Sequence, residues 1–132
     1  MTQKQQADRA LVKQHTPHLK HITGGFVLSG ITAPHIKGLD MAEQCRAALE
    51  QGVELLAQQG HALHDVTHIL CTVADAENFP SCFPVFRQFF PSISPIMTLM
   101  WLKDAPSSQP KIIFELVVQE EVAEAQEEDY AF

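Results

Sequence analysis

Hydrophobic and small residues recur at helical spacing between Asp40 and Gly60. They share one face of a helix of 3.6 residues per turn and are Met41, Cys45, Ala48, Leu49, Gly52 and Leu56. Asp40 with Glu43 three residues later matches the pattern of a capping box, and Gly60 stands where a left-handed residue would end the helix. We therefore predict an amphipathic helix from Asp40 to about residue 59, roughly 30 Å long, that needs a broad apolar partner.

Five shorter apolar runs have the length and composition of β-strands, namely residues 18–22, 26–30, 66–73, 96–102 and 112–118. Thr23-Gly24-Gly25 predicts that the first two pair as a hairpin. Phenylalanines three or four apart predict a second helix over 77–90, in which Pro84 requires a late start or a kink. The order of elements predicts an α+β fold, a mixed β-sheet with two helices packed on one face. The other face is apolar in the last two strands, which is typical of a domain that associates with copies of itself.

The length of 132 residues fits one domain. We predict a single domain over 1–132, with an N-terminal arm over 1–16 and an acidic C-terminal tail over 119–132. The formal net charge of −7 argues against a nucleic-acid partner, which would require a basic stripe. No apolar run approaches the roughly 18 residues of a membrane span, and Met1 is not followed by a signal-peptide apolar region. We expect a cytoplasmic protein with no membrane partner.

Cysteine and histidine are two residue types of this chain that could carry chemistry. Cys45, Cys71 and Cys82 form no CxxC pair, so we interpret them as buried small side chains in a reducing compartment. Six of the seven histidines have spacings of three or four, namely His15, His18, His21, His61, His64 and His68. Those spacings fall on a loop, strands and a turn, where the side chains diverge, so we predict exposed histidines, no metal site and no cofactor.

The order and spacing of several weak motifs resemble the YjgF/RidA family of small trimeric proteins, over roughly residues 17–118. The motifs are Phe26-Val27-Leu28-Ser29-Gly30, Ala57-Gln58-Gln59-Gly60, His64-Asp65-Val66, Ala74-Asp75, Asn78-Phe79, Phe89-Phe90, Pro95 and the strand 112–118. The resemblance implies a chorismate-mutase-like (YjgF-like) trimer-forming fold, with ligand clefts between subunits. It also implies hydrolysis of imines or enamines, such as 2-aminoacrylate or 2-iminobutanoate, to a 2-keto acid and ammonia. An RNA-cleaving role (endoribonuclease L-PSP) is also attached to the family, and the acidic charge disfavours it here.

The sequence departs from the family pattern at the residues that carry this chemistry. Family members hold the substrate carboxylate with the arginine of a Pro-x-Arg-Ser/Thr motif, and a guanidinium fork matches a carboxylate bidentately. Here the motif reads Pro95-Ile96-Met97-Thr98, so Met97 stands at the arginine position. Ile113 replaces the first acidic residue of the last strand, whereas Glu115 matches the second. His18 replaces a tyrosine, and Ser29 is retained.

By this resemblance the cleft residues are His18, Ser29, Met97, Thr98 and Glu115, with Ser29 and Glu115 the candidates for catalysis. The alternative for Ser29 is a turn serine that bonds to its own backbone. Met97 and Trp101 share one strand face, where they pack in a core or a trimer interface or else form a ligand wall. Glu115 is either a cleft acid or part of a structural bond between subunits. Arg87, on the second helix, is a further candidate cation for the cleft.

Two functions follow from these alternatives. One is a divergent RidA-like protein whose intersubunit cleft binds a small metabolite without catalysis or with altered activity. The other is an imine/enamine deaminase, a hydrolase of carbon–nitrogen bonds. The loss of the arginine and of the first acid favours the first. The sequence leaves open the ligand, the pathway and the role of the acidic tail.

Overall fold

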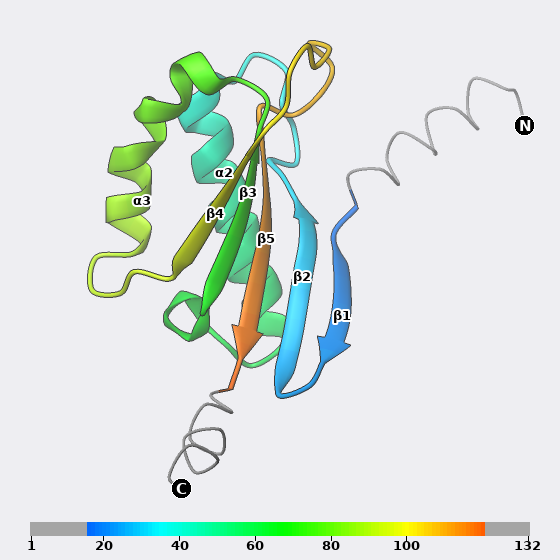
Figure 1. Ribbon diagram of the computed structural model, residues 1–132, viewed down its shortest axis with the longest axis vertical. Helices are drawn as coiled ribbons and strands as arrows, with labels where there is room; N and C mark the ends of the chain where they lie inside the picture. Colours follow the sequence, from blue (N-terminus) through cyan, green and yellow to red (C-terminus); the bar gives the residue numbers. More distant parts are fainter. Residues whose placement is uncertain (1–15, 121–132) are drawn as a thin grey trace, which may run out of the picture.

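The computed structural model describes residues 16–120, which form one β-sheet with two helices on one of its faces (Figure 1). The strands are β1 (His18–Ile22), β2 (Gly25–Ile31), β3 (His68–Val73), β4 (Ile96–Trp101) and β5 (Ile112–Gln119). The helices are α2 (Met41–Gln58) and α3 (Phe83–Phe89), with 3-10 turns η1 (Leu63–Asp65) and η2 (Ala76–Cys82). The predicted α+β fold is confirmed. Most of the N-terminal arm (1–16) and of the acidic tail (119–132) lies outside the described residues.

The strand order in the sheet is β1-β2-β5-β3-β4. β1 and β2 form the predicted hairpin, β5 pairs antiparallel with both β2 and β3, and β4 pairs parallel with β3. The last strand of the described residues is therefore in the centre of the sheet, and β4 is an edge strand. β5 extends to Gln119, one residue past the predicted end, because Gln119 pairs with Gly25.

Helix α2 begins and ends where the sequence predicts. Asp40 accepts a hydrogen bond from the Glu43 backbone N–H at 2.8 Å, and the Glu43 side chain accepts from the Asp40 N–H at 3.0 Å, which completes a capping box. Gly60 has a φ of +76°, the left-handed conformation that glycine adopts without strain. The six predicted core positions of the helix are all buried.

The second predicted helix is two elements rather than one. Residues 76–82 form the 3-10 helix η2, and α3 begins only at Phe83, with Pro84 in its first turn. Pro84 has no backbone N–H to donate within a continuous helix. Of the two alternatives that the sequence left open, a late helix start and a kink, the late start is therefore correct.

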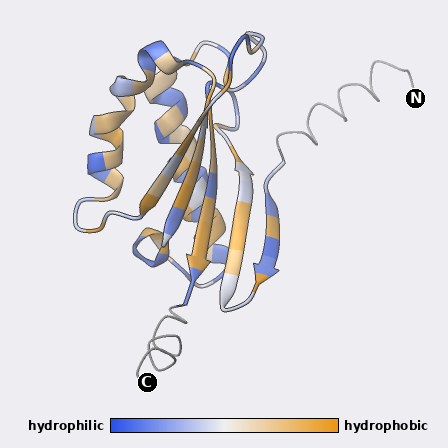
Figure 2. Cartoon of the chain, viewed as in Figure 1, coloured by the Kyte–Doolittle hydropathy of each residue, from blue (hydrophilic) through white to orange (hydrophobic). Residues whose placement is uncertain are grey.

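The core lies between the sheet and the helices. Figure 2 shows hydrophobic residues along the strands and along both helices. Alternate residues of the central strands are almost fully buried there, among them Ile69, Cys71, Val73, Ile112, Phe114 and Leu116. Aromatic pairs extend this core: Phe86 meets the buried Phe114 edge-on, with ring centroids 6.1 Å apart. At the edge of the sheet, the buried Phe79 meets the half-exposed Trp101 edge-on, with ring centroids 5.5 Å apart.

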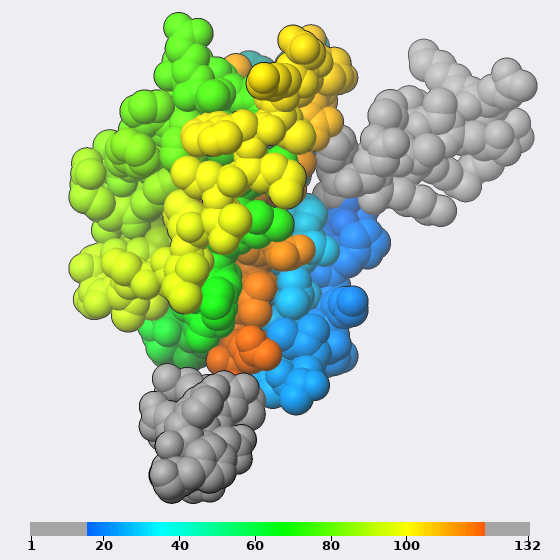
Figure 3. All heavy atoms as spheres, in the orientation of Figure 1, coloured from blue at the N-terminus to red at the C-terminus, as the bar shows by residue number. Residues whose placement is uncertain are grey.

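The other side of the sheet, which we call the open face, is covered by no helix in the described part of the chain (Figure 3). The residues that alternate with the core residues lie there, including Val27, Leu70, Ile113 and Val117, all partly exposed. At the edge strand, Ile96 is 63% exposed and Met100 is 49% exposed. The apolar character predicted for this face is confirmed.

Candidate functional site

A row of paired residues crosses the open face of the sheet, and it is polar on every strand except β3. His18 on β1 is paired with Ser29 on β2. Leu70 on β3 is paired with both Glu115 on β5 and Thr98 on β4. Leu28 pairs with Leu116 and Ile31 with Phe114, so a β-bulge places Ser29 and Gly30 opposite Glu115.

Four of the five predicted cleft residues lie in this row, so we call His18, Ser29, Glu115 and Thr98 the polar row. Neighbouring strands are about 4.8 Å apart, which sets Ser29 beside both His18 and Glu115. Thr98 is two strands from Glu115, across Leu70. His18 and Thr98 are exposed, and Ser29 and Glu115 are partly exposed, so each of the four is accessible from the open face.

The fifth predicted cleft residue, Met97, points to the other face of the sheet. It is paired with Ile69, which is 1% exposed on the helix side, and Met97 itself packs against the core. Within one chain, the five predicted residues therefore do not form one site. Since Met97 is on an edge strand, its side chain is accessible from beyond the edge of the sheet.

Met97 lines a small pocket between β4 and α3, with a volume of about 190 Å³. The walls are mainly apolar and also include Phe86, Phe90, Ile93 and Pro95. Arg87 is the only charged residue among the lining residues. This pocket, which we call the Met97 pocket, therefore combines an apolar wall with one guanidinium from the second helix. The sequence named Arg87 as a candidate, and the structure places it at the same pocket as Met97.

The three cysteines are all buried and free. Burial raises the pKa of the Cys71 thiol to about 12, and a hydrogen bond with Cys82 together with burial raises the pKa of Cys45. Thiolates of Cys45 and Cys71 are therefore scarce at neutral pH, as expected for structural cysteines.

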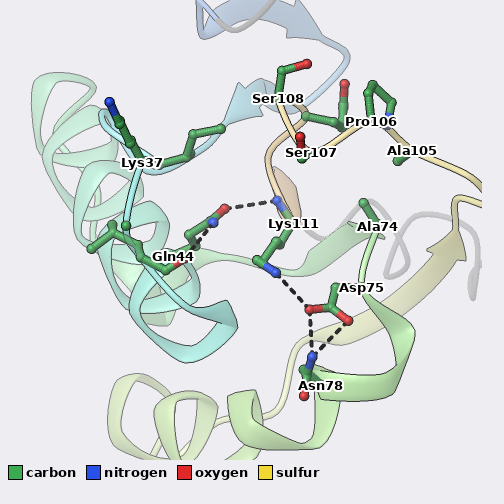
Figure 4. Close-up of a pocket in the computed structure, with 14 residues that line it drawn as sticks. Lys37, Gln44, Ala74, Asp75, Asn78, Ala105, Pro106, Ser107, Ser108 and Lys111 are labelled. Atoms are coloured by element: carbon green, nitrogen blue, oxygen red, sulfur yellow. Dashed lines mark hydrogen bonds and ion pairs between the residues drawn. The ribbon is translucent and has the colours of Figure 1, made fainter.

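A larger cavity, with a volume of about 850 Å³, lies where the loop before α2, the end of β3 and the β4–β5 loop meet (Figure 4). Sequence reasoning did not find it. Its one signal is Gln44, a polar residue on the apolar stripe of α2, only three positions after Met41. Gln44 is 3% exposed, and a buried amide requires partners.

Comparison with solved structures gives the class of fold. Rv2704 of Mycobacterium tuberculosis, a member of the YjgF/YER057c/UK114 family, is 25% identical, with a TM-score of 0.66 over 76% of this chain and 83% of that chain. The YjgF gene product of E. coli is 18% identical, with a TM-score of 0.66 over 78% and 86%. RidA of Psychrobacter sp. PAMC 21119 is 16% identical, with a TM-score of 0.65 over 76% and 85%. No family model and no curated protein matches the sequence.

The chain therefore has the YjgF/RidA fold, and the resemblance found in the sequence is confirmed at that level. No helix between residues 16 and 120 is both long and apolar enough to cross a membrane.

Proposed function

We propose that this chain is a divergent RidA-like protein that forms a homotrimer in the cytoplasm and binds a small metabolite in a cleft between subunits, with altered or no deaminase activity. The observation that carries the proposal is the place of Met97 on the edge strand, where a thioether stands at the position of the family arginine. A thioether gives no charge-assisted bond to a carboxylate, and such bonds contribute roughly 1.5–3 kcal/mol.

Assembly is supported by the apolar surface at β4 and on the open face. Ile96, Leu99, Met100 and Trp101 are between 38% and 63% exposed, a concentration that a monomer would leave in contact with water. In an assembly that joins this edge to the open face of a neighbour, the Met97 pocket of one subunit would face the polar row of the next. The free buried thiols fit a reducing compartment.

The assembly is tested by light scattering of the protein at micromolar concentration. We expect the mass of a trimer, and we expect Met100→Arg to lower it, because that exposed side chain would carry a charge into the apolar contact. A monomeric wild-type protein would contradict the trimer.

The cleft is tested by the release of ammonia and 2-keto acid from 2-aminoacrylate generated in situ, with an arginine-containing RidA protein as the positive control. We expect little or no acceleration over buffer. Met97→Arg is expected to increase carboxylate binding by about tenfold or more, because one bidentate pair contributes more than 1.4 kcal/mol. Met97→Lys is the matched control, since it adds the charge without the planar fork.

The alternative function, an imine/enamine deaminase, is favoured by one observation, the presence of Arg87 at the Met97 pocket. In that pocket Arg87 would replace the family arginine. His18, Ser29 and Glu115 would face it from the open face of the next subunit. Acceleration by the wild-type protein near the rate of the control, lost in Arg87→Gln, would establish this alternative. It would also contradict the proposal of altered or absent activity. RNA cleavage has less support, because the chain carries a net charge of −7.

A further inference from the structure

The 850 Å³ cavity is distinct from the Met97 pocket and from the polar row, with which it shares no lining residue. Met97 is at the start of β4, whereas the cavity is lined by the loop that follows β4 and by Ala74 and Asp75, which follow β3. Its volume is within the roughly 300–1,000 Å³ of small-molecule sites. The cavity lies within a single chain, so its existence does not depend on a trimer.

The floor of the cavity is fixed by Gln44. Its Nε2 donates to the Leu39 carbonyl at 3.2 Å, and its Oε1 accepts from the Lys111 backbone N–H at 2.9 Å. The Lys111 carbonyl in turn accepts from the Ala74 N–H at 2.8 Å. These bonds join the loop before α2 to the ends of β3 and β5, so the floor of the cavity is held in place before a ligand binds.

A charge pair lies on the wall beside this floor. Lys111 Nζ is 3.1 Å from Asp75 Oδ2, and the Asn78 side-chain amide donates to both oxygens of Asp75 at 2.9 and 3.1 Å. The Asn78 amide and the Lys111 ammonium hold the pKa of Asp75 below its usual value, so this carboxylate is ionised at neutral pH. Lys111 is thereby held in place while its side chain is still 40% exposed, with ammonium hydrogens left for a ligand.

The lining carries a net positive charge in a chain of net charge −7. Lys37, at the rim, is exposed and forms no ion pair with any residue between 16 and 120. With Asp75 neutralised by Lys111, Lys37 supplies the excess charge. The hydroxyl groups of Ser107 and Ser108 lie on the loop opposite α2, and Ile36 and Pro106 add apolar surface.

We propose that this cavity is a second ligand site, which binds a small organic anion that also carries hydroxyl groups. The ammonium groups of Lys37 and Lys111 hold its carboxylate or phosphate, and Ser107 and Ser108 hydrogen-bond to its hydroxyl groups. Two cations on flexible stems suit either kind of anionic group, because an ammonium binds as a point charge rather than as a fork.

The test is an NMR titration of the full chain with three probes: D-glycerate for the carboxylate, glycerol 3-phosphate for the phosphate, and glycerol as the uncharged control. We expect saturable shifts of the backbone amides of residues 37–39, 74–78 and 107–111 with one or both anions at millimolar concentration, and none with glycerol. The anion that binds more tightly identifies the group that the lysines hold.

Lysine variants separate a built site from general attraction of anions. We expect Lys37→Gln and Lys111→Gln each to weaken binding about fivefold, or about 1 kcal/mol, and the double variant to abolish it. Lys103→Gln is the matched control. Lys103 is an exposed lysine of the β4–β5 loop, and it does not line the cavity. Lys37 is exposed, so its variant should fold even if Lys111→Gln does not. Absent shifts with both anions, equal shifts with glycerol, or equal weakening by Lys37→Gln and Lys103→Gln would overturn the proposal.

Discussion

Replacement of Gly25 by alanine should separate β2 from β5 at one end of the sheet. A Cβ atom on Gly25 would lie 1.8 Å from the Val118 carbonyl oxygen and 2.9 Å from Gln119 Cα. Real Cβ contacts are essentially never shorter than 3.0 Å, and these are backbone atoms that cannot rotate away. The two strands would therefore have to move apart by at least about 1.2 Å.

The magnitude follows from the hydrogen bonds that such a movement breaks. Beside Gly25, the Glu120 N–H donates to the Gly24 carbonyl at 2.8 Å and Gln119 Nε2 donates to the Thr23 carbonyl at 3.1 Å. Each bond contributes about 0.5–1.5 kcal/mol net, and the ladder between Gly25 and Gln119 is lost with them. Partial exposure of Phe26, which is 6% exposed in the native sheet, adds to the loss. We expect Gly25→Ala to lower the free energy of unfolding by about 3 kcal/mol, and the Tm by about 10 °C.

Urea unfolding followed by circular dichroism measures this loss. Gly38→Ala is the matched control, because a Cβ there meets no atom within 4 Å, although its φ of +81° is strained for alanine. The free energy of unfolding of the Gly38→Ala control should fall by only about 1 kcal/mol, which is the cost of the left-handed conformation for alanine. Equal urea midpoints for Gly25→Ala and the wild-type protein would refute the close approach of β2 to β5.

Three further predictions concern the core, the acid limb of stability and the thiols. Phe114→Ala, at a residue that is 0% exposed, should cost about 3–5 kcal/mol in urea unfolding; a loss below about 1 kcal/mol would contradict its central position. Because its native pKa is lowered by Asn78 and Lys111, Asp75 contributes stability that is present above pH of about 4 and lost as the pH falls through that native pKa. Asp75→Asn should therefore reduce the slope of unfolding free energy against pH below about 4, and an unchanged slope would contradict the pairing with Lys111. A thiol reagent at pH 8 should leave the buried Cys71 unmodified until the protein unfolds, since its pKa is about 12, and rapid native labelling would contradict that burial.

The sequence was informative where one face of an element is buried over several turns. The stripe from Met41 to Leu56 gave the buried face of α2, and its capping residues gave both ends, because these depend on local spacing. The late start of α3 at Phe83 was only one of two alternatives, the other being a kink, since the effect of Pro84 depends on what packs around it. The 3-10 helix η2 was not predicted.

The candidate site was less accessible to sequence reasoning, because it depends on strand order and register. The row of His18, Ser29 and Glu115 requires β5 to lie between β2 and β3, and no local pattern specifies that insertion. The cavity above Gln44 is similar, since its walls come from three loops that are distant in the sequence. The sequence does show Gln44 on the apolar stripe of the helix. That position indicates a buried polar contact but does not identify the partner of the amide.

The central position of β5 has a consequence for the order in which the protein can fold during synthesis. β1 and β2 can pair as soon as they emerge, and β3 can pair with β4, but these two pairs touch through β5 rather than through each other. Residues 112–119 are made after the other four described strands, so this sheet cannot close until they are available. Until then the nascent chain carries two unpaired apolar strand edges, the kind of surface on which chaperones act and aggregation begins. A ribosome-bound chain stalled before Ile112 should therefore be readily cleaved by protease, whereas one stalled far enough beyond Gln119 for β5 to emerge should resist it.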